Sequence, residues 1–251
     1  MTTGHLVMLS RPGAYTASGE HRPGGLLNKI RIHPRTPAPS QAHIAELGKL
    51  PSAVVSDQLE RHGLPLGITQ LTRPELGILA GPALTVRTRP GDNLAIHKAI
   101  DIAEPGDVLV VDAGGSMDRA VMGEIVVLHA ASRGVAGLVV DGALRDGAEI
   151  ARGDLPVFAR GFVHLGPFRD GPGELRGTIS LGGAVIANGD VVVADTDGVA
   201  IVPTPRIEEV ITNGLALLAK EETTIPQARA GELDTSWLDA IEVEWVGEAR
   251  P

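Results

Sequence analysis

The sequence predicts a domain of the α/β class, in which buried strands alternate with helices. Residues 108–111 and 137–140 are uninterrupted apolar runs, as expected of strands that are covered on both faces. Residues 123–133 between them predict a helix, and glycine-rich sequence follows each strand. Because a strand, a helix and a second strand in this order are typical of parallel sheets, we expect the two strands to be parallel neighbours.

The composition allows a large aliphatic core and excludes several kinds of chemistry. Of 251 residues, 43% are hydrophobic but only 2% are aromatic, so valine, isoleucine, leucine and alanine must fill the core. The absence of cysteine excludes disulfides, thiolate metal sites and cysteine nucleophiles. A net charge of −9 and a pI near 5.3 argue against nucleic acid as a partner. No apolar run reaches the roughly 18 residues of a membrane helix and no signal peptide is evident, so we expect a cytoplasmic protein without a membrane partner.

Three regions are expected along the chain. Residues 1–39 are rich in proline, glycine, arginine and histidine, and they predict an extended or flexible N-terminal arm. Residues 40–230 are expected to form the α/β domain, and residues 231–251 a C-terminal tail.

Hydrophobic spacing and turn residues predict the elements of the domain. Asp92 and Asn93 are residues that cap helix starts, Gly63 ends a helix, and Gly81-Pro82 separates the first two strands. The predicted helices are 40–50, 52–63, 93–102, 123–133 and 205–230. The predicted strands are 78–80, 83–88, 108–111, 137–140, 178–181, 184–186, 191–194 and 199–202.

The candidate catalytic residues follow two predicted strands. Glu124 comes directly after Gly123 at a helix start, where free N–H groups and the positive end of the helix dipole favour an anion. Arg145 and Asp146 come after the second strand and its Gly142 turn, the usual position of ligand sites in α/β sheets. Arginine offers a fork of donors to a carboxylate or enolate, and carboxylates are hard ligands for a divalent cation. If the two strands are neighbours, these residues meet in a metal-assisted site for a small keto acid.

Other polar residues have a structural interpretation. Asp112 follows a buried strand and either binds a ligand or orients the glycine turn after it; we favour the turn. His97 and His129 lack a partner at metal-ligand spacing, so we expect both to be structural. Residues 195–198 are typical of a turn between two strands. The sequence contains neither a nucleophile elbow nor a Walker phosphate loop.

From Gly81 to Pro203 the chain resembles the family that joins the RraA-type regulators of RNase E to the 4-hydroxy-4-methyl-2-oxoglutarate aldolases. Ser56-Asp57 before Leu59 extends the resemblance to about residues 44–230. The matching motifs are Gly81-Pro-Ala, Gly91-Asp-Asn, Pro105-Gly-Asp-Val, Gly123-Glu, Val140-Asp-Gly, Arg145-Asp146, Pro156-Val-Phe-Ala-Arg-Gly161, Gly189-Asp190 and Asp195-Thr-Asp197-Gly198-Val. Several motifs in the right order identify the family more firmly than the substrate.

The resemblance implies a swivelling β/β/α-type sandwich with added N- and C-terminal helices, assembled as a homotrimer or homohexamer with sites between subunits. In the aldolase branch an acidic residue, twenty intervening residues, Arg-Asp and a further acid form the pattern; here these are Glu124, Arg145-Asp146 and Glu149. Aspartate is commoner at the first position, so Glu124, which reaches one methylene further, is a departure. The aldolases also place an acidic residue of the C-terminal helix near the next subunit's cation, and Glu221 is our candidate for that role.

The predicted function is a divalent-metal-dependent aldolase that cleaves 4-hydroxy-2-oxo acids to pyruvate, with oxaloacetate decarboxylation as a side activity. We expect Asp146 to bind Mg²⁺ or Mn²⁺ directly, Glu124 to bind it through water, and Arg145 to contact the keto or enolate oxygen. The backbone N–H groups that are expected to hold the pyruvate carboxylate are those of Gly123, Glu124, Ile125 and Val126. The alternatives are an RraA-type, non-enzymatic regulator of RNase E and a related oxo-acid decarboxylase or dehydratase.

Overall fold

The structure is a computed structural model that describes residues 29–244 and residue 246. Its α-helices are α1 (Gln41–Leu47), α2 (Ser52–Gln58), α3 (Leu94–Ile102), α4 (Glu124–Ser132), α5 (Gly147–Arg152) and α6 (Ile207–Ala230). Short 3₁₀ helices are η1 (Pro74–Leu76), η2 (Thr204–Arg206) and η3 (Ser236–Ala240). Its strands are β1 (Ile30–Ile32), β2 (Thr69–Gln70), β3 (Leu79–Thr88), β4 (Val108–Asp112), β5 (Ala120–Met122), β6 (Gly137–Leu144), β7 (Val157–Phe162), β8 (Gly173–Leu175), β9 (Ile179–Leu181), β10 (Ala184–Ile186), β11 (Val191–Asp195) and β12 (Gly198–Val202).

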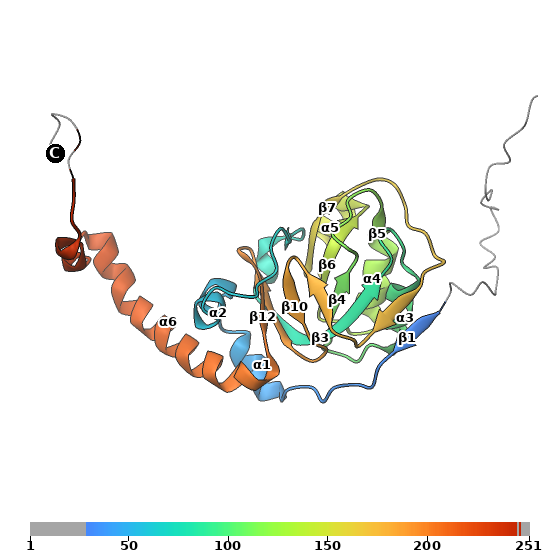
Figure 1. Ribbon diagram of the computed structural model, residues 1–251, viewed down its shortest axis with the longest axis horizontal. Coiled ribbons are helices and arrows are strands. Elements are labelled where there is room, and N and C mark those ends of the chain that lie inside the picture. The colour runs from blue at the N-terminus through green and yellow to red at the C-terminus, as the bar shows by residue number, and fades with distance from the viewer. Residues whose placement is uncertain (1–28, 245, 247–251) are drawn as a thin grey trace, which may run out of the picture.

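The centre of the main sheet is parallel, with the strand order β3-β4-β6-β7 (Figure 1). The predicted pairing of the strands at 108–111 and 137–140 is confirmed, because β4 and β6 pair in parallel from Val108 opposite Gly137 onward. Side chains that alternate along β4 enter different hydrophobic cores: Leu109 packs on one face and Val108 on the other. This strand is therefore buried on both faces, as its uninterrupted apolar sequence predicted.

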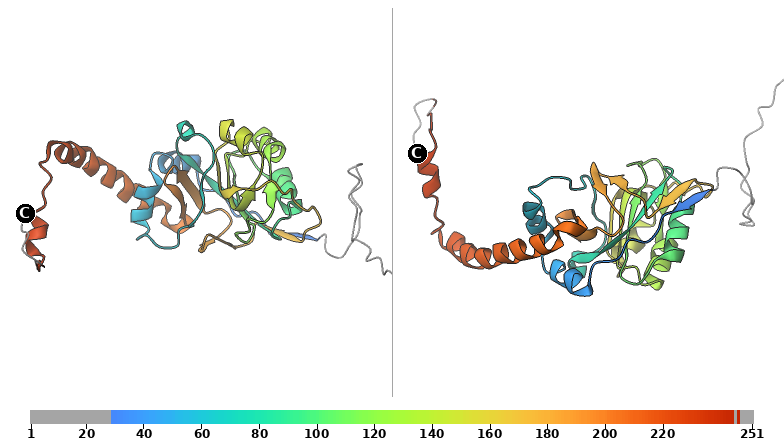
Figure 2. Two further views of the ribbon diagram at one scale, coloured as in Figure 1. Left: turned by 90° about the horizontal axis from the view of Figure 1, so that it is seen from above. Right: turned by 60° about the horizontal axis from the view of Figure 1, so that its bottom comes forward.

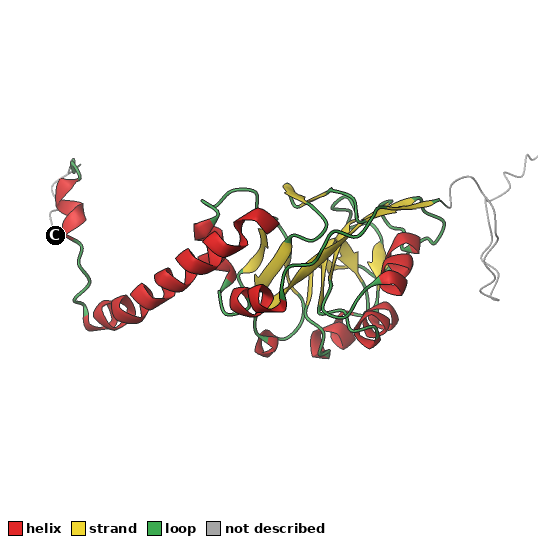
Figure 3. Cartoon of the chain, turned by 90° about the horizontal axis from the view of Figure 1, so that it is seen from below, coloured by secondary structure: helices red, strands yellow, loops and turns green. Residues whose placement is uncertain are grey.

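The central sheet lies between a helical layer and a second β layer (Figures 2 and 3). Helices α3, α4 and α5 cover one face and enclose the first core. Strands β9 to β12 cover the opposite face and enclose the second core. Helices α1, α2 and the start of α6 pack on the outer side of the β11–β12 hairpin and enclose a third core. This is the expected β/β/α sandwich with helices added at both ends of the chain.

Strand β3 runs without interruption through Gly81-Pro82, where the sequence predicted two separate strands. Its first half pairs with β11, and from Ala83 onward it pairs with β4. Proline cannot donate a hydrogen bond to a neighbouring strand, but at Pro82 the strand is changing partners. Gly81 is required by a close approach, since a Cβ there would lie 2.7 Å from the carbonyl oxygen of Gly106.

The end of β6 also differs from the prediction. The sequence placed a turn at Gly142, but pairing with β5 and β7 continues to Leu144. Gly142 is instead buried within the strand. A Cβ at this position would come 3.0 Å from the Cβ of Ala113, so the packing favours glycine there. The strand consequently ends directly before Arg145.

Helices α1 and α2 are shorter than the predicted ranges 40–50 and 52–63. Helix α1 ends at Leu47 and α2 at Gln58. After α2, Glu60 and Arg61 adopt left-handed φ angles of 57° and 60°, which a right-handed helix cannot accommodate. The closing helix, predicted over 205–230, is confirmed as η2 followed by α6.

Most of helix α6 extends away from the sandwich (Figure 1). Of the predicted arm, residues 1–28 lie outside the described residues, and β1 in the remainder pairs in parallel with β8. Helix α6 begins against α1 and α2, but from residue 219 to residue 244 every side chain is exposed except for the half-buried Glu221 and Thr224. Within the described part of the chain, no helix has both the length and the apolar character that a bilayer crossing requires.

Candidate active site

Two parallel strands bring the candidate catalytic residues together. Strand β5 pairs in parallel with β6, with Met122 opposite Leu144, and the Arg145 N–H donates to the Met122 carbonyl oxygen at 3.0 Å. The residues that follow each strand are therefore adjacent at the same edge of the sheet. The expectation that Glu124 would lie beside the Arg145-Asp146 pair was based on the strands at 108–111 and 137–140; the strand that brings these residues together is β5, which the sequence did not predict.

Asp146 joins the two segments through its carboxylate. Its Oδ2 accepts a hydrogen bond from the Glu124 N–H at 3.0 Å, and so caps α4 from a different segment. The Asp146 backbone is left-handed, with φ 61° and ψ 46°, a conformation that aspartate tolerates better than most residues. Gly123 permits the approach, because a Cβ at that position would overlap Asp146 Oδ2.

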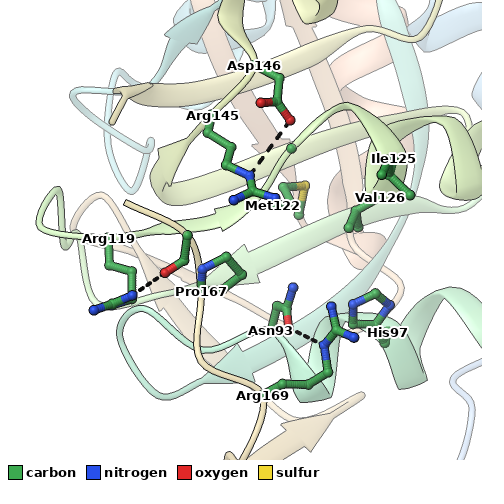
Figure 4. Close-up of a pocket in the computed structure, with 12 residues that line it drawn as sticks. Asn93, His97, Arg119, Met122, Ile125, Val126, Arg145, Asp146, Pro167 and Arg169 are labelled. Atoms are coloured by element: carbon green, nitrogen blue, oxygen red, sulfur yellow. Dashed lines mark hydrogen bonds and ion pairs between the residues drawn. The ribbon is translucent and has the colours of Figure 1, made fainter. Parts of the chain in front are cut away.

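A cavity of about 460 Å³ opens beside this junction (Figure 4). Its lining comes from the start of α3, the end of β5, the start of α4, the end of β6, and the segment between β7 and β8. The lining residues are Asn93, His97, Arg119, Met122, Gly123, Ile125, Val126, Arg145, Asp146, Gly166, Pro167 and Arg169. A cavity of this size has room for a small organic acid.

Positive charge dominates the cavity. Arg119, Arg145 and Arg169 line it, whereas Asp146 is the one carboxylate among the lining residues. Arg145 Nε lies 3.8 Å from Asp146 Oδ2, which is too far for a direct hydrogen bond and leaves the guanidinium donors available to a ligand. The arrangement is suited to an anion with more than one negative group.

The cavity wall also contains an imidazole, that of His97. Burial lowers the pKa of His97 below its ordinary value of 6.5, and the positive charge of Arg169 and the nearby His129 lower it further. His97 Nε2 is buried and has no hydrogen-bond partner among the described residues. Figure 4 shows His97 beside the Arg169 side chain. The sequence predicted a structural His97, but the structure places it in the cavity wall.

The sequence did not identify Asn93, Arg119 and Arg169 as site residues. Asn93 and His97 are separated by one helical turn of α3, so both can face the cavity, and the Gly91-Asp-Asn motif was the available signal. Arg119 and Arg169 lie in irregular segments with no periodicity. Arg169 Nε donates to Asn93 Oδ1 at 3.4 Å, and Arg119 stacks 4.0 Å from the centre of the Phe168 ring.

The predicted backbone cradle at the start of α4 is only partly available. Gly123 and Val126 line the cavity, and Ile125 lines it with a side chain that is 80% exposed. However, the Glu124 N–H is donated to Asp146 and the Val126 N–H to the Gly123 carbonyl oxygen. The Glu124 side chain is half-buried and is not part of the cavity lining.

Glu221 is not brought to this cavity within one chain. It lies on the part of α6 that extends from the sandwich, on the side away from α4 (Figure 1). A role for Glu221 at the site therefore requires a second copy of the chain.

The carboxylates at the site fit some cations and not others. Within the described residues, no three His, Asp or Glu side chains converge, so a caged cation does not fit. Asp146 caps α4 with Oδ2, and its other oxygen can bind a cation without breaking that bond. A hydrated Mg²⁺ or Mn²⁺ fits, because such ions are held by one or two carboxylates together with waters and substrate oxygens.

Two structural interpretations from the sequence are confirmed. Asp112 Oδ1 accepts a hydrogen bond from the Gly114 N–H at 3.0 Å and so orients the glycine turn after β4. Asp195 and Gly198 close the β11–β12 hairpin, and the Asp195 carboxylate accepts hydrogen bonds from the Ser52 N–H at 2.8 Å and hydroxyl at 2.6 Å.

Comparisons with known proteins agree with the fold and the site motifs. A model of the RraA-like family, described as aldolase/RraA, matches residues 52–201. A protein of Halalkalibacterium halodurans, provisionally named a 4-hydroxy-4-methyl-2-oxoglutarate aldolase, is 38% identical over 184 residues, which cover 71% of this chain and 85% of the relative. A solved structure from Pseudomonas syringae pv. tomato has a TM-score of 0.70 and 27% identity, and covers 78% of this chain and 92% of its own. Streptomyces coelicolor RraAS2, described as an unusual member of the RNase ES inhibitor RraA family, has a TM-score of 0.70 and 27% identity over 75% of this chain and 99% of its own.

The chain belongs to the RraA-like (aldolase/RraA) family, as its motifs predicted. The family model covers the strands and helices that build the cavity. The relatives' names include both an aldolase and a ribonuclease inhibitor, so the family alone does not select between an enzyme and a regulator.

Proposed function

We propose that this protein is a divalent-cation-dependent aldolase that cleaves a 4-hydroxy-2-oxo acid to pyruvate and a second oxo compound. The observation that carries the proposal is the junction of Arg145 and Asp146 with the start of α4, beside a cavity lined by arginines. A protein that acts only by masking a partner needs no such cavity. The aldolase name of the 38% identical relative supports the same reaction class.

Arg145 is assigned to the oxygen that becomes negative during the reaction. Cleavage of the carbon–carbon bond leaves an electron pair on the pyruvate fragment, and that charge moves to the oxygen of an enolate. The guanidinium of Arg145 donates hydrogen bonds to this oxygen and stabilises it more strongly than the uncharged ketone. Decarboxylation of oxaloacetate passes through the same enolate, so we expect it as a side activity.

Asp146 is assigned as the direct cation ligand, with Glu124 acting through water. When bound, Mg²⁺ or Mn²⁺ would supply Lewis-acid polarisation of the substrate's keto oxygen. Asp146 also holds the start of α4, so the same carboxylate positions the backbone N–H groups there, of which those of Glu124 and Val126 are already donated within the protein. The base that deprotonates the 4-hydroxyl is left unassigned.

The positions of the other arginines favour a substrate with a second carboxylate. Arg119 and Arg169 line the cavity from the segments before β5 and before β8, separate from Arg145 at the end of β6. Arg145 is one cationic group, and Arg119 with Arg169 forms the other. These two separated groups match the two carboxylates of 4-hydroxy-4-methyl-2-oxoglutarate and of oxaloacetate. We therefore propose an oxo dicarboxylate substrate.

Pyruvate release tests the proposal directly. Purified protein is incubated with 4-hydroxy-4-methyl-2-oxoglutarate or oxaloacetate, with Mg²⁺ or with EDTA, and pyruvate is measured by a coupled assay. We expect Mg²⁺-dependent release from both substrates. Activity that survives EDTA would disprove the metal requirement, and the absence of pyruvate from both substrates would disprove the assignment.

The second candidate function is regulation of a ribonuclease. The observation that favours it is the likeness to RraAS2, whose description names RNase ES inhibition. A stoichiometric complex with an RNase E-type enzyme and loss of its activity, without keto-acid turnover, would support regulation. If pyruvate forms only from other oxo acids, a substrate panel with Mg²⁺ would instead identify a related decarboxylase or dehydratase.

We also propose a homotrimer or homohexamer in which α6 packs on a neighbouring copy. The exposed part of α6 and the residues after it have unpartnered apolar side chains within the described chain, among them Ile225, Leu233 and Trp237. Beside the cavity, Ile125 and Leu128 on α4 are 80% and 59% exposed. Joining such surfaces removes both from water, and it would bring Glu221 of one copy toward the cavity of the next.

A further inference from the structure

One wall of the cavity is an irregular segment, residues 163–172, which we call the wall segment. It joins β7 to β8 and supplies Gly166, Pro167 and Arg169 to the cavity. Because it has no strand or helix of its own, hydrogen bonds to other parts of the chain must define its shape. Its first half is bonded to Leu144, Arg119 and Ala120, and its second half is bonded to the turn between β3 and α3.

Asp92 in that turn is a fully buried carboxylate, with 0% of its surface exposed. Its Oδ2 accepts hydrogen bonds from the N–H groups of Asp170 and Gly171, both at 2.9 Å, and from Arg89 Nη2 at 3.1 Å. Its Oδ1 accepts from the Leu94 N–H at 2.9 Å. One side chain therefore joins the end of the wall segment to the first residue of α3.

Backbone bonds and stacking complete this junction. The Phe168 N–H donates to the Gly91 carbonyl oxygen at 2.8 Å, and the Asn93 N–H donates to the Phe168 carbonyl oxygen at 3.1 Å. Arg119 and Arg89 lie 4.0 Å and 5.2 Å from the centre of the Phe168 ring. Both chain neighbours of Arg169, Phe168 and Asp170, are therefore held by hydrogen bonds to this turn.

The direction of the Arg169 side chain depends on the same junction. Its Nε donates to Asn93 Oδ1 at 3.4 Å, and Asn93 follows Asp92 directly. Both partners of this bond are thus positioned by segments that Asp92 joins. A long arginine side chain loses little further freedom on binding a carboxylate if it is already oriented.

We infer that Asp92 is a positioning residue, which does not contact the substrate but orients Arg169 toward the second carboxylate of an oxo dicarboxylate. The inference rests on the proposed function for the identity of the ligand. Asp92 is buried behind the wall segment and is absent from the cavity lining. Its effect should be specific to ligands that have the second carboxylate.

The test compares two ligands that differ in that group. 2-Oxoglutarate has a second carboxylate and 2-oxobutyrate lacks one, and calorimetry measures the binding of each in the presence of Mg²⁺. In Asp92→Asn an NH₂ group replaces an acceptor that faces N–H donors, so the wall segment should shift. We expect 2-oxoglutarate binding to weaken about tenfold, the equivalent of one charge-assisted hydrogen bond, while 2-oxobutyrate binding changes less than about twofold.

A double-mutant cycle separates positioning from general loss of structure. Arg169→Ala should weaken 2-oxoglutarate binding, and adding Asp92→Asn to it should have no further effect, since the residue that Asp92 orients is gone. The control is Asp190→Asn: Asp190 is also buried and accepts two backbone N–H bonds, but it lies outside the cavity lining. It should lower the unfolding midpoint without changing the preference between the ligands.

Three results would overturn the inference. They are equal weakening of both ligands in Asp92→Asn, additive effects in the cycle, and a wild-type protein that does not prefer 2-oxoglutarate. The aldolase proposal fails separately, if the wild type binds 2-oxoglutarate as expected but releases no pyruvate from any hydroxy-oxo acid.

Discussion

At the scale of single residues, the site depends on side chains that serve two purposes. Asp146 caps α4 and is the proposed cation ligand, and its left-handed backbone directs the carboxylate toward Glu124 rather than to its own helix. Such a conformation in a residue other than glycine costs about 1 kcal/mol or more, and the surrounding contacts must offset it. Strained backbone conformations of this kind are expected at functional sites, where the position of a side chain matters more than the stability it costs.

Arg145→Lys should reduce turnover far more than stability. Lysine keeps the positive charge but loses the planar fork of donors, so kcat for pyruvate release should fall about 100-fold. The unfolding midpoint should change little, because the side chain is 44% exposed. Arg152→Lys is the matched control, since Arg152 is exposed on α5 and pairs only with Glu149 among the described residues. Near-normal kcat in Arg145→Lys would place the site elsewhere.

His97 should make the folded state sensitive to pH. Its pKa is lowered in the folded protein, so below about pH 6.5 the unfolded chain takes up a proton that the folded chain does not. Stability should therefore rise with pH between the lowered pKa and 6.5, and show no contribution from His97 above that range. Urea unfolding from about pH 5 to about pH 7 measures this slope, which His97→Gln should reduce. An unchanged slope would mean that His97 titrates normally.

At the scale of elements, the site lies where the ends of two strands and the starts of two helices come together. Strands β5 and β6 are parallel neighbours, and the chain leaves them at adjacent points to form α4 and α5. The strands are held by the buried core, whereas the residues that follow them are free of the sheet's hydrogen-bond pattern. Rigid support next to irregular backbone is the usual condition for a ligand site in α/β proteins.

Gly123→Ala tests whether the close contact between the start of α4 and the end of β6 is needed for the site. The φ angle of Gly123 is −139°, which alanine adopts easily, so any effect must come from crowding of the new methyl group against Asp146 and Arg145. Loss of the cap on α4 should destabilise the protein by about 1 kcal/mol, and displacement of both side chains should abolish most turnover. Gly153→Ala is the control, because Gly153 has an ordinary φ of −68° and lies outside the cavity lining. Equal kinetics for the two variants would refute the role of Gly123.

At the scale of the whole molecule, the chain is well packed around its sheet, but among the residues that the structure describes none packs against α6 along most of its length. The buried residues of this helix, Ile207, Val210 and Gly214, all lie in its first third. The remainder extends from the sandwich, and residues 231–244 are exposed. An apolar surface of this kind is more readily explained by an assembly than by a solitary chain.

Light scattering should accordingly give a mass of three or six times 26.1 kDa. If α6 of one copy reaches the next cavity, Glu221→Gln should raise the Mg²⁺ concentration for half-maximal activity about tenfold. Glu222→Gln, one position further on the helix and more exposed, should have a smaller effect. A fully active monomer, or two variants with unchanged Mg²⁺ dependence, would show that α6 takes no part in the site.

Local sequence pattern by itself determined most of the sandwich. Uninterrupted apolar runs identified β4 and β6 as strands buried on both faces, and Gly123 marked the start of α4 correctly. The adjacency of Glu124 and the Arg145-Asp146 pair was also expected, although the strand that produces it is β5, which the sequence did not predict. These features depend on hydrophobic periodicity and on helix-start chemistry, which neighbouring residues in the chain decide.

Only the tertiary structure decided which other residues join the site. Arg119 and Arg169 come from irregular segments. Asp92 holds the wall segment through contacts with Asp170 and Gly171, which lie 78 and 79 positions further along the chain. The same applies to Gly142, which looks like a turn residue but is buried in β6 because Ala113 packs against it. Contacts between distant segments leave no periodic trace in the sequence, since they depend on how the packed layers bring the segments together. The sequence therefore determined the central strands β3, β4 and β6, the second β layer and the two motifs at the edge of the sheet, and the packing of the layers decided the charge and shape of the cavity.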